Sequence, residues 1–188
     1  MYREGRECLE QLGYTILSVT GDGFSGIKSA FSDIPYQMCH VHMERLVIKG
    51  TTRNPQTEAG IVLLALVRTL KKTNYYTLKK RLKYFLEKYR NFLNEKTIHP
   101  LSGESSYTHE GVRFAFNSLL RFVNDLFVFK RNKKISRTTN SIEGHFSHIK
   151  RVTSIHRGLS KQQKQRVLHS ILLASSVAPS EKKIKYVV

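Results

Sequence analysis

Cysteine, acidic residues and long apolar runs are all scarce in this 188-residue sequence. Two cysteines, Cys8 and Cys39, are too few for a small fold that depends on disulfides. The longest apolar run, residues 60–67, falls well short of the ~18 residues of a membrane-spanning helix. The first residues are charged and lack the apolar stretch of a secretory signal peptide. We therefore expect a cytoplasmic protein with no membrane partner.

The shortage of acidic residues leaves a large positive charge. Lys and Arg number 32 against 14 Asp and Glu, which gives a formal net charge of +18. A charge run is usually only a solvated face, but so lopsided an excess favours a polyanionic partner, above all a nucleic acid. Hydrophobic residues make up 40% of the chain, enough for a packed core.

The N-terminal part has the pattern of a parallel strand pair. A helix is expected over residues 2–12, with Gly13 as its stop. Residues 14–20 are rich in β-branched and aromatic residues and predict a strand. A short helix within residues 24–31 and a second strand over residues 34–43 follow. Strand, helix and strand at this spacing are typical of a parallel pair.

The rest of the chain has helical periodicity. We expect helices over residues 57–72, 75–94 and 108–127, a helix from about Ser141, a break at Gly158 and a last helix over 160–175. The first three should each bury an apolar stripe: Ile61, Leu64 and Val67 on the first, Leu78, Leu82, Phe85, Leu86, Tyr89 and Leu93 on the second, and Val112, Phe116, Leu119, Leu120 and Val123 on the third. A turn-rich loop is expected near residues 99–106. The predicted organisation is 1–43 as an α/β core, 44–130 as a helical insertion, 131–176 as C-terminal core helices and 177–188 as a tail.

Basic side chains gather on the helix expected over residues 75–94, in the linker that precedes Ser141 and on the helix that follows it. Such clusters are the electrostatic footprint of nucleic-acid binding. The predicted DNA-binding residues are Lys79, Lys80, Arg81, Lys83, Lys133, Lys134, Arg137, Lys150, Arg151 and Arg157.

Asp22 stands at the end of the first predicted strand, between two glycines. The C-terminal ends of parallel strands are where open α/β sheets place ligands and catalytic groups. Asp-Gly is equally a common turn dipeptide, and the sequence leaves both interpretations open.

Cys39 and His42 form a C-x2-H motif on the second predicted strand. This is half of a zinc site, but structural zinc takes four ligands and no second short-spaced pair follows. A closed zinc site is therefore not expected. The alternative is a buried strand cysteine beside an unrelated histidine.

Glu143 is a lone carboxylate in a basic segment. With Asn140 as the N-cap and Glu143 three residues on, the two would make a pair like a capping box. The helix would place Glu143 on one face with Ser147 and Lys150, and would bury Ile142, Phe146 and Ile149 on the neighbouring face. The other interpretation is a metal-binding carboxylate used in phosphoryl transfer. The two interpretations are compatible.

Three motifs in this order resemble those of the mutator-type (MULE-like) DDE transposases of bacterial insertion sequences. They are GYTILSVTGDGFSGIKSAF, then IPYQMCHVHM, then TTNSIEGHFSHIK followed by HRGLS, and the resemblance spans residues 13–173. It implies an RNase H-like core with an all-helical insertion before the final core helix. It also implies a bacterial, nucleoid-associated protein that acts on double-stranded DNA, with a homo-oligomer as a further expectation.

The resemblance implies a role for particular residues. Asp22 matches the second catalytic aspartate, Glu143 the catalytic glutamate, and Cys39 with His42 the motif close to the active site. The family uses Mg²⁺ (or Mn²⁺), held by three carboxylates, for cleavage at transposon ends and strand transfer. No aspartate precedes Asp22, so the first strands of the core and the first catalytic aspartate are missing. We therefore expect a C-terminal portion that is inactive alone.

Two rival interpretations remain open. The chain would act as a non-catalytic DNA-binding fragment if its helices bind DNA without the carboxylates. A structural RNA-binding protein is the third interpretation, and it gives the carboxylates no role.

Overall fold

The computed structural model describes residues 2–155 and 158–177. The predicted contact residue Arg157 and almost all of the expected tail lie outside the described residues. The chain divides into two compact units, Met1–Thr138 and Thr139–Val188, which we describe separately. No helix within the described ranges is long and apolar enough to cross a membrane.

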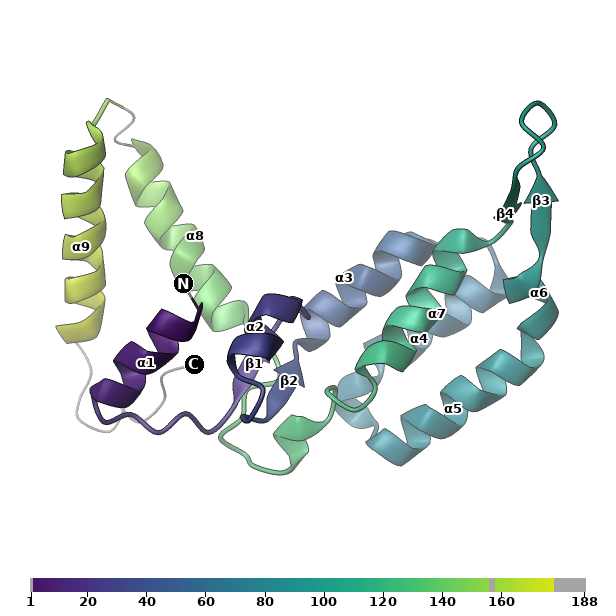
Figure 1. Cartoon of the computed structure of the whole chain (residues 1–188), viewed down its shortest axis with the longest axis horizontal. Helices are drawn as coiled ribbons and strands as arrows, with labels where there is room; N and C mark the ends of the chain where they lie inside the picture. Colours follow the sequence, from purple (N-terminus) through teal and green to yellow (C-terminus); the bar gives the residue numbers. More distant parts are fainter. Residues whose placement is uncertain (1, 156–157, 178–188) are drawn as a thin grey trace. The chain divides into compact units, whose positions relative to one another are not determined.

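A short parallel strand pair organises the first part of the first unit. Helix α1 (Tyr2–Gln11) ends before Gly13, as expected, and an extended stretch leads to β1 (Val19–Gly21). Helix α2 (Ser25–Ala30) then connects to β2 (Tyr36–Met38), which pairs with β1 in parallel (Figure 1). The predicted strand–helix–strand order is confirmed, although each strand is only three residues long.

The second strand ends earlier than predicted. Helix α3 (His40–Thr51) begins two residues after Met38, with Cys39 in its N-cap position, so the expectation that Cys39 and His42 lie on a strand is wrong. The physical reason is that the buried residues follow the spacing of a helix and not that of a strand: Met43, Val47 and Thr51 are buried four residues apart. The C-x2-H motif thus spans a strand-to-helix junction, with His42 in the first turn of α3.

Five helical elements lie between α3 and the end of α7 in this unit. Thr57 caps the next helix by accepting a hydrogen bond from the Gly60 amide, and Asn74 caps another by accepting one from Thr77. The expected helices over 57–72 and 75–94 are each broken in two, at Thr69 and at Tyr89. These elements are α4 (Glu58–Arg68), the 3-10 turn η1 (Leu70–Lys72), α5 (Tyr75–Lys88), α6 (Arg90–Asn94) and α7 (Glu110–Phe122).

Burial follows the predicted stripes on α5 and α7 better than on α4. Leu78, Leu82 and Phe85 are buried along α5 as expected, but Leu86 is exposed, as is Leu120 of α7. Ile61 of α4 was expected in the core and is exposed. Helix α4 is apolar on nearly every side, so periodicity alone could not identify the face that packs.

A β-hairpin stands where the sequence predicted only a loop. Strands β3 (Lys96–Ile98) and β4 (Ser105–Tyr107) pair antiparallel and extend away from the helices (Figure 1). Their residues are almost all exposed, so the alternation that identifies a half-buried strand is absent from the sequence. Residues 44–130 are therefore not all helical.

One continuous core joins the strand pair to the helices. Val19, Tyr36 and Met38 belong to the same buried cluster as Leu63 and Leu119. The expected boundary between residues 43 and 44 falls inside α3 and does not separate two cores. The fold is mixed α/β and mostly helical, with two small two-stranded sheets among the described residues.

The outer edge of β2 is closed by the chain that follows α7. The Met38 amide donates to the Asp125 carbonyl over 2.9 Å. The fully buried Gln37 side chain donates to the Leu126 carbonyl and accepts from the Phe129 amide, at 3.2 and 2.9 Å. The 3-10 turn η2 (Val128–Lys130) follows directly. These bonds satisfy polar groups that would otherwise be buried without partners.

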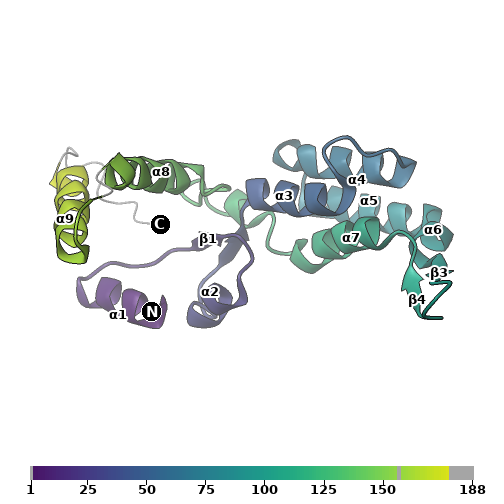
Figure 2. The same ribbon diagram turned by 90° about the horizontal axis from the view of Figure 1, so that it is seen from above.

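Helices α3 and α7 pack closely, and glycines make this possible. A Cβ atom built on Gly50 would clash with the Gly111 carbonyl oxygen, and one built on Gly111 would clash with the Gly50 carbonyl oxygen. The two backbones therefore touch directly. Both helices lie within the array seen from above in Figure 2.

The second unit holds two helices, α8 (Asn140–Ile155) and α9 (Lys161–Val177), which start within one residue of the predicted positions. Ile149 is buried, as expected. Ile142 and Phe146 were expected on the buried face and are exposed, Phe146 to 53%. Their exposure shows that the apolar stripe of α8 is only partly covered within this unit.

We predict that Gly50→Ala and Gly111→Ala each lower the free energy of unfolding by about 1–3 kcal/mol, because the added methyl group forces two backbones apart. Urea denaturation followed by circular dichroism measures the loss. Gly144→Ala is the control, since a Cβ on Gly144 of α8 meets nothing within 4 Å. That variant should be unchanged or slightly more stable. Equal effects of all three substitutions would contradict the close approach.

Candidate functional site

The two parallel strands end side by side, and candidate residues follow each of them. Gly21 pairs with Met38, and the Cys39 amide donates to the Gly21 carbonyl over 2.8 Å. Asp22 and Cys39 therefore leave the sheet at the same edge, with Asp22 exposed and Cys39 fully buried. This is the edge at which the sequence predicted a functional aspartate.

The glycines on either side of Asp22 are required by the packing of the loop. A Cβ on Gly21 would lie 2.8 Å from the Tyr36 hydroxyl. Gly23 has a φ of +95°, and a Cβ there would lie 2.7 Å from the Phe122 ring. The Gly23 amide donates to the Tyr36 hydroxyl over 2.7 Å. Tyr36 and Phe122 thus hold the loop that presents Asp22.

The Asp22 carboxylate also has the local role of a turn residue. Its Oδ1 accepts a hydrogen bond from the Phe24 amide over 3.0 Å, two residues along the chain. The turn interpretation is therefore confirmed as a geometric fact. It leaves Oδ2, which lies on an exposed side chain, available to another ligand.

An ion pair that the sequence did not reveal lies beside this loop. Lys28 Nζ of α2 contacts Asp125 Oδ2 at 2.6 Å and lies 5.1 Å from the centre of the Tyr36 ring. Burial raises the pKa of Tyr36 to about 12, and the negative charges of Asp22 and Asp125 act in the same direction. Lys28 and Asp125 are 97 residues apart, and no local pattern relates them.

His40 is a second residue that the sequence analysis did not single out. Its Nε2 lies 2.8 Å from the Leu126 carbonyl oxygen, so the neutral ring carries its proton on Nε2 and donates it there. Burial lowers the pKa of His40 below its ordinary value, although this hydrogen bond opposes the shift. The ring packs edge-on against Phe129 at 5.3 Å. His40 thus fixes the start of α3 against the chain after α7.

His42 lies in the same turn, with its Nε2 3.3 Å from Arg45 Nη1. The Cys39 and His42 side chains come from the N-cap and the third residue of α3. No group of three His, Cys, Asp or Glu residues that could hold a metal ion occurs within the described residues. A site built on Cys39 and His42 alone therefore lacks ligands.

Glu143 belongs to the second unit, near the start of α8. The helix begins at Asn140, one residue earlier than a cap at Asn140 would require. Thr139 takes the cap position instead, and its hydroxyl donates to Glu143 Oε1 over 2.6 Å. The predicted pairing of Asn140 with Glu143 thus has Thr139 as its partner instead, because the helix already includes Asn140. Glu143 is half-buried, and Ser147 donates to its carbonyl.

Carboxylate oxygens are ligands that Mg²⁺ prefers, and Asp22 and Glu143 both supply them. Asp22 lies in the first unit and Glu143 in the second. Neither of them belongs to a three-residue metal-binding group within the described chain. The donor chemistry of each carboxylate therefore fits Mg²⁺.

The predicted DNA-binding side chains on α5 are exposed. Lys79 lies 3.4 Å from the Tyr75 hydroxyl, and Lys83 lies 3.9 Å from Glu87. Lys80 and Arg81 form no ion pair with any described residue. The basic residues Lys133, Lys134, Arg137, Lys150 and Arg151 are exposed as well.

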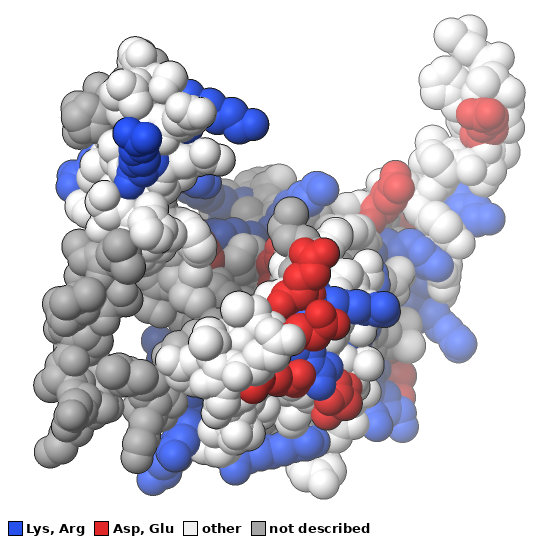
Figure 3. Space-filling view, turned by 60° about the vertical axis from the view of Figure 1, so that its left-hand side comes forward, with Lys and Arg blue, Asp and Glu red and all other residues white. Residues whose placement is uncertain are grey.

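The positive charge is not uniform over the surface. On the face drawn in Figure 3, Asp and Glu side chains gather in one area, with Lys and Arg around them. One acidic group is compensated locally, because Arg6 of α1 pairs with both Glu10 and Asp33, and this holds the pKa of Asp33 below its usual value. Helix α5, in contrast, carries five Lys and Arg residues against one Glu.

Comparison with protein-family models, with curated proteins and with solved structures finds no match to this chain.

We predict an alkaline loss of stability that depends on Tyr36. Its folded-state pKa is raised from 10.0 to about 12, so its contribution to stability is complete below pH 10 and is lost as the pH rises toward 12. Urea denaturation of the protein and of Tyr36→Phe over this range measures the difference. The variant should lose less stability with pH, and should be less stable near neutral pH because the Gly23 amide loses its acceptor. Parallel pH profiles would count against a buried Tyr36 hydroxyl.

Proposed function

We propose that this chain is a DNA-handling protein of the mutator-type DDE transposase class. Asp22 and Glu143 are its carboxylate ligands for Mg²⁺, and the cationic surface of α5 is its DNA-binding face. The strand pair with α2 would then be the part of an RNase H-like core that carries the second catalytic aspartate, and residues 44–130 would be the insertion.

One observation carries the proposal: an exposed aspartate leaves the carboxyl edge of a parallel strand pair in a loop held by Tyr36 and Phe122. A carboxylate that serves only as a turn residue does not need its loop fixed from a strand and a distant helix. Metal-assisted phosphoryl transfer does need fixed carboxylates at such an edge.

The chain's own residues have distinct roles in this proposal. Asp22 and Glu143 supply oxygen ligands, and the bound metal would supply charge stabilisation for the attacking and leaving oxygens. Thr139 orients Glu143 through the hydroxyl that donates to its Oε1. Lys79, Lys80, Arg81 and Lys83 neutralise backbone phosphates.

A DNA-binding protein without catalysis is the second candidate. It is favoured by the exposed, strongly basic face of α5 and by the lack of a three-ligand metal group within the described ranges. In that case EDTA and Asp22→Asn leave DNA binding unchanged.

We predict salt-sensitive binding of double-stranded DNA that depends on α5. Replacing Lys79, Lys80, Arg81 and Lys83 by Gln should reduce the slope of log Kd against log salt by about 0.9 for each phosphate that is no longer neutralised. Fluorescence anisotropy of a labelled duplex at several salt concentrations measures the slope. The matched control exchanges Lys for Arg and Arg for Lys at the same positions, which keeps the charge. An unchanged slope in the Gln variant would place the DNA elsewhere on the chain.

We predict that the purified chain leaves supercoiled plasmid intact in Mg²⁺ or Mn²⁺. Two carboxylates supply fewer ligands than the three that hold the metal ions in this chemistry. Agarose electrophoresis of the plasmid over time measures nicking. Nicking that disappears in Glu143→Gln would refute the predicted inactivity and would assign the carboxylate a catalytic role.

A further inference from the structure

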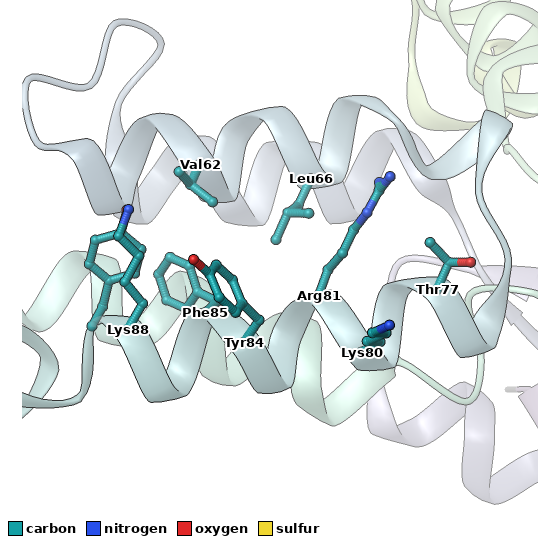
Figure 4. Close-up of a pocket in the computed structure, with 9 residues that line it drawn as sticks. Val62, Leu66, Thr77, Lys80, Arg81, Tyr84, Phe85 and Lys88 are labelled. Atoms are coloured by element: carbon teal, nitrogen blue, oxygen red, sulfur yellow. The ribbon is translucent and has the colours of Figure 1, made fainter.

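A cavity of about 420 Å³ lies between α4 and α5, and Asp22 is not among the residues that line it. Its volume falls within the ~300–1,000 Å³ of typical small-molecule pockets. Figure 4 shows Val62 and Leu66 pointing into it from α4, and Tyr84 and Phe85 facing them from α5. Phe85 is buried and stacks on Phe116 of α7 at 5.2 Å, so this wall of the cavity is anchored in the core.

An exposed aromatic ring stands at the opening. Tyr84 is 65% exposed and lies one residue before the buried Phe85. It makes no ring–ring or cation–π contact with another described residue. A solvent-facing ring beside an apolar cavity offers a surface on which a planar group can stack.

Cations flank the apolar part of the cavity, and the lining contains no acidic residue among those the structure describes. Arg81 extends from α5 toward α4, while Lys88 lies at the opposite end of the cavity (Figure 4). Lys88 is held by Glu58 at 2.7 Å, and this pairing raises its pKa. Lys80 and Arg81 lack an ion-pair partner within the described part of the chain, so their charge is available to an anionic ligand.

A buried polar group also lines the cavity. Tyr89 is only 8% exposed, and its hydroxyl, which lies near Glu58 and Lys88, makes no hydrogen bond of good geometry to a described residue. That hydroxyl is closed off from solvent, so a ligand in the cavity would meet the polar side chain of Thr77 instead. The cavity therefore suits a ligand with a flat face, a polar edge and a nearby negative charge.

We propose that this cavity binds an unpaired nucleotide of single-stranded DNA, with the base stacked on Tyr84 and the phosphate on Lys80 and Arg81. A nucleotide has all three features, whereas a lipid tail has neither flat face nor polar edge. A second copy of this chain is disfavoured because each copy carries a formal charge of +18. The inference rests on the proposed binding of DNA and adds a preference for unpaired bases, which duplex contacts along α5 do not require.

The test uses the full chain and a short oligodeoxythymidylate that carries one 2-aminopurine, alone and annealed into a duplex. Stacking on an aromatic ring quenches 2-aminopurine fluorescence, and anisotropy gives the affinity for each form. We expect quenching on the single strand, and about a tenfold loss of single-strand affinity in Tyr84→Ala, the size expected for one base–aromatic stack. Tyr84→Phe should keep both signals, because it keeps the ring.

Tyr76→Ala is the matched control, since Tyr76 is an 81% exposed tyrosine of the same helix outside the cavity. Equal effects of Tyr84→Ala and Tyr76→Ala would overturn the inference, while salt-sensitive duplex binding would leave the proposed function standing. Quenching that depends on Tyr84 without any duplex binding would support the inference and remove the proposed function. Competition by an acidic helical peptide with the same dependence on Tyr84 would overturn the nucleotide assignment in favour of a protein partner.

Discussion

The direct backbone contact between α3 and α7 is the constraint on which the first unit depends. Gly50 lies near the end of α3 and Gly111 near the start of α7, so the two helices run antiparallel where they touch. The start of α3 consequently lies near the end of α7. Because α3 follows β2 almost directly, this arrangement brings the chain after α7 alongside the strand pair.

That return of the chain explains why a sheet of two very short strands persists. Two-stranded sheets are marginal by themselves. Here the Gln37 side chain and the Met38 amide take their partners from Asp125, Leu126 and Phe129, and His40 adds a hydrogen bond to Leu126. The strand pair is thus supported by bonds that exist only because α3 and α7 are held together.

Parts of this arrangement could be predicted from the sequence, and the differences have physical causes. The stripe of α5 combines Leu78, Leu82 and Phe85 with a strongly basic opposite face, so its existence and orientation were predicted. Ile61 was misplaced because an almost wholly apolar helix carries no directional signal. The hairpin was missed because its strands are exposed on both faces. The cap of α8 was misassigned by one residue, which is the usual uncertainty at a helix end.

The candidate site, too, could be predicted from the sequence only in part. The place of Asp22 followed from the apolar strand before it, since a strand end is a local property of the sequence. The residues that fix Asp22 were not predictable, because Tyr36 and Phe122 act across the fold and the pair of Lys28 with Asp125 joins segments 97 residues apart. Phe122 belongs to α7, so the loop that presents Asp22 takes part of its shape from the helices expected to form a separate insertion. A change in α3–α7 packing would therefore alter the position of the Asp22 loop, because Phe122 of α7 packs against it. It would also alter the cavity, because Phe85 in its wall stacks on Phe116 of α7. The strand-end carboxylate and the cationic helix are consequently two surfaces of one packed unit rather than independent modules.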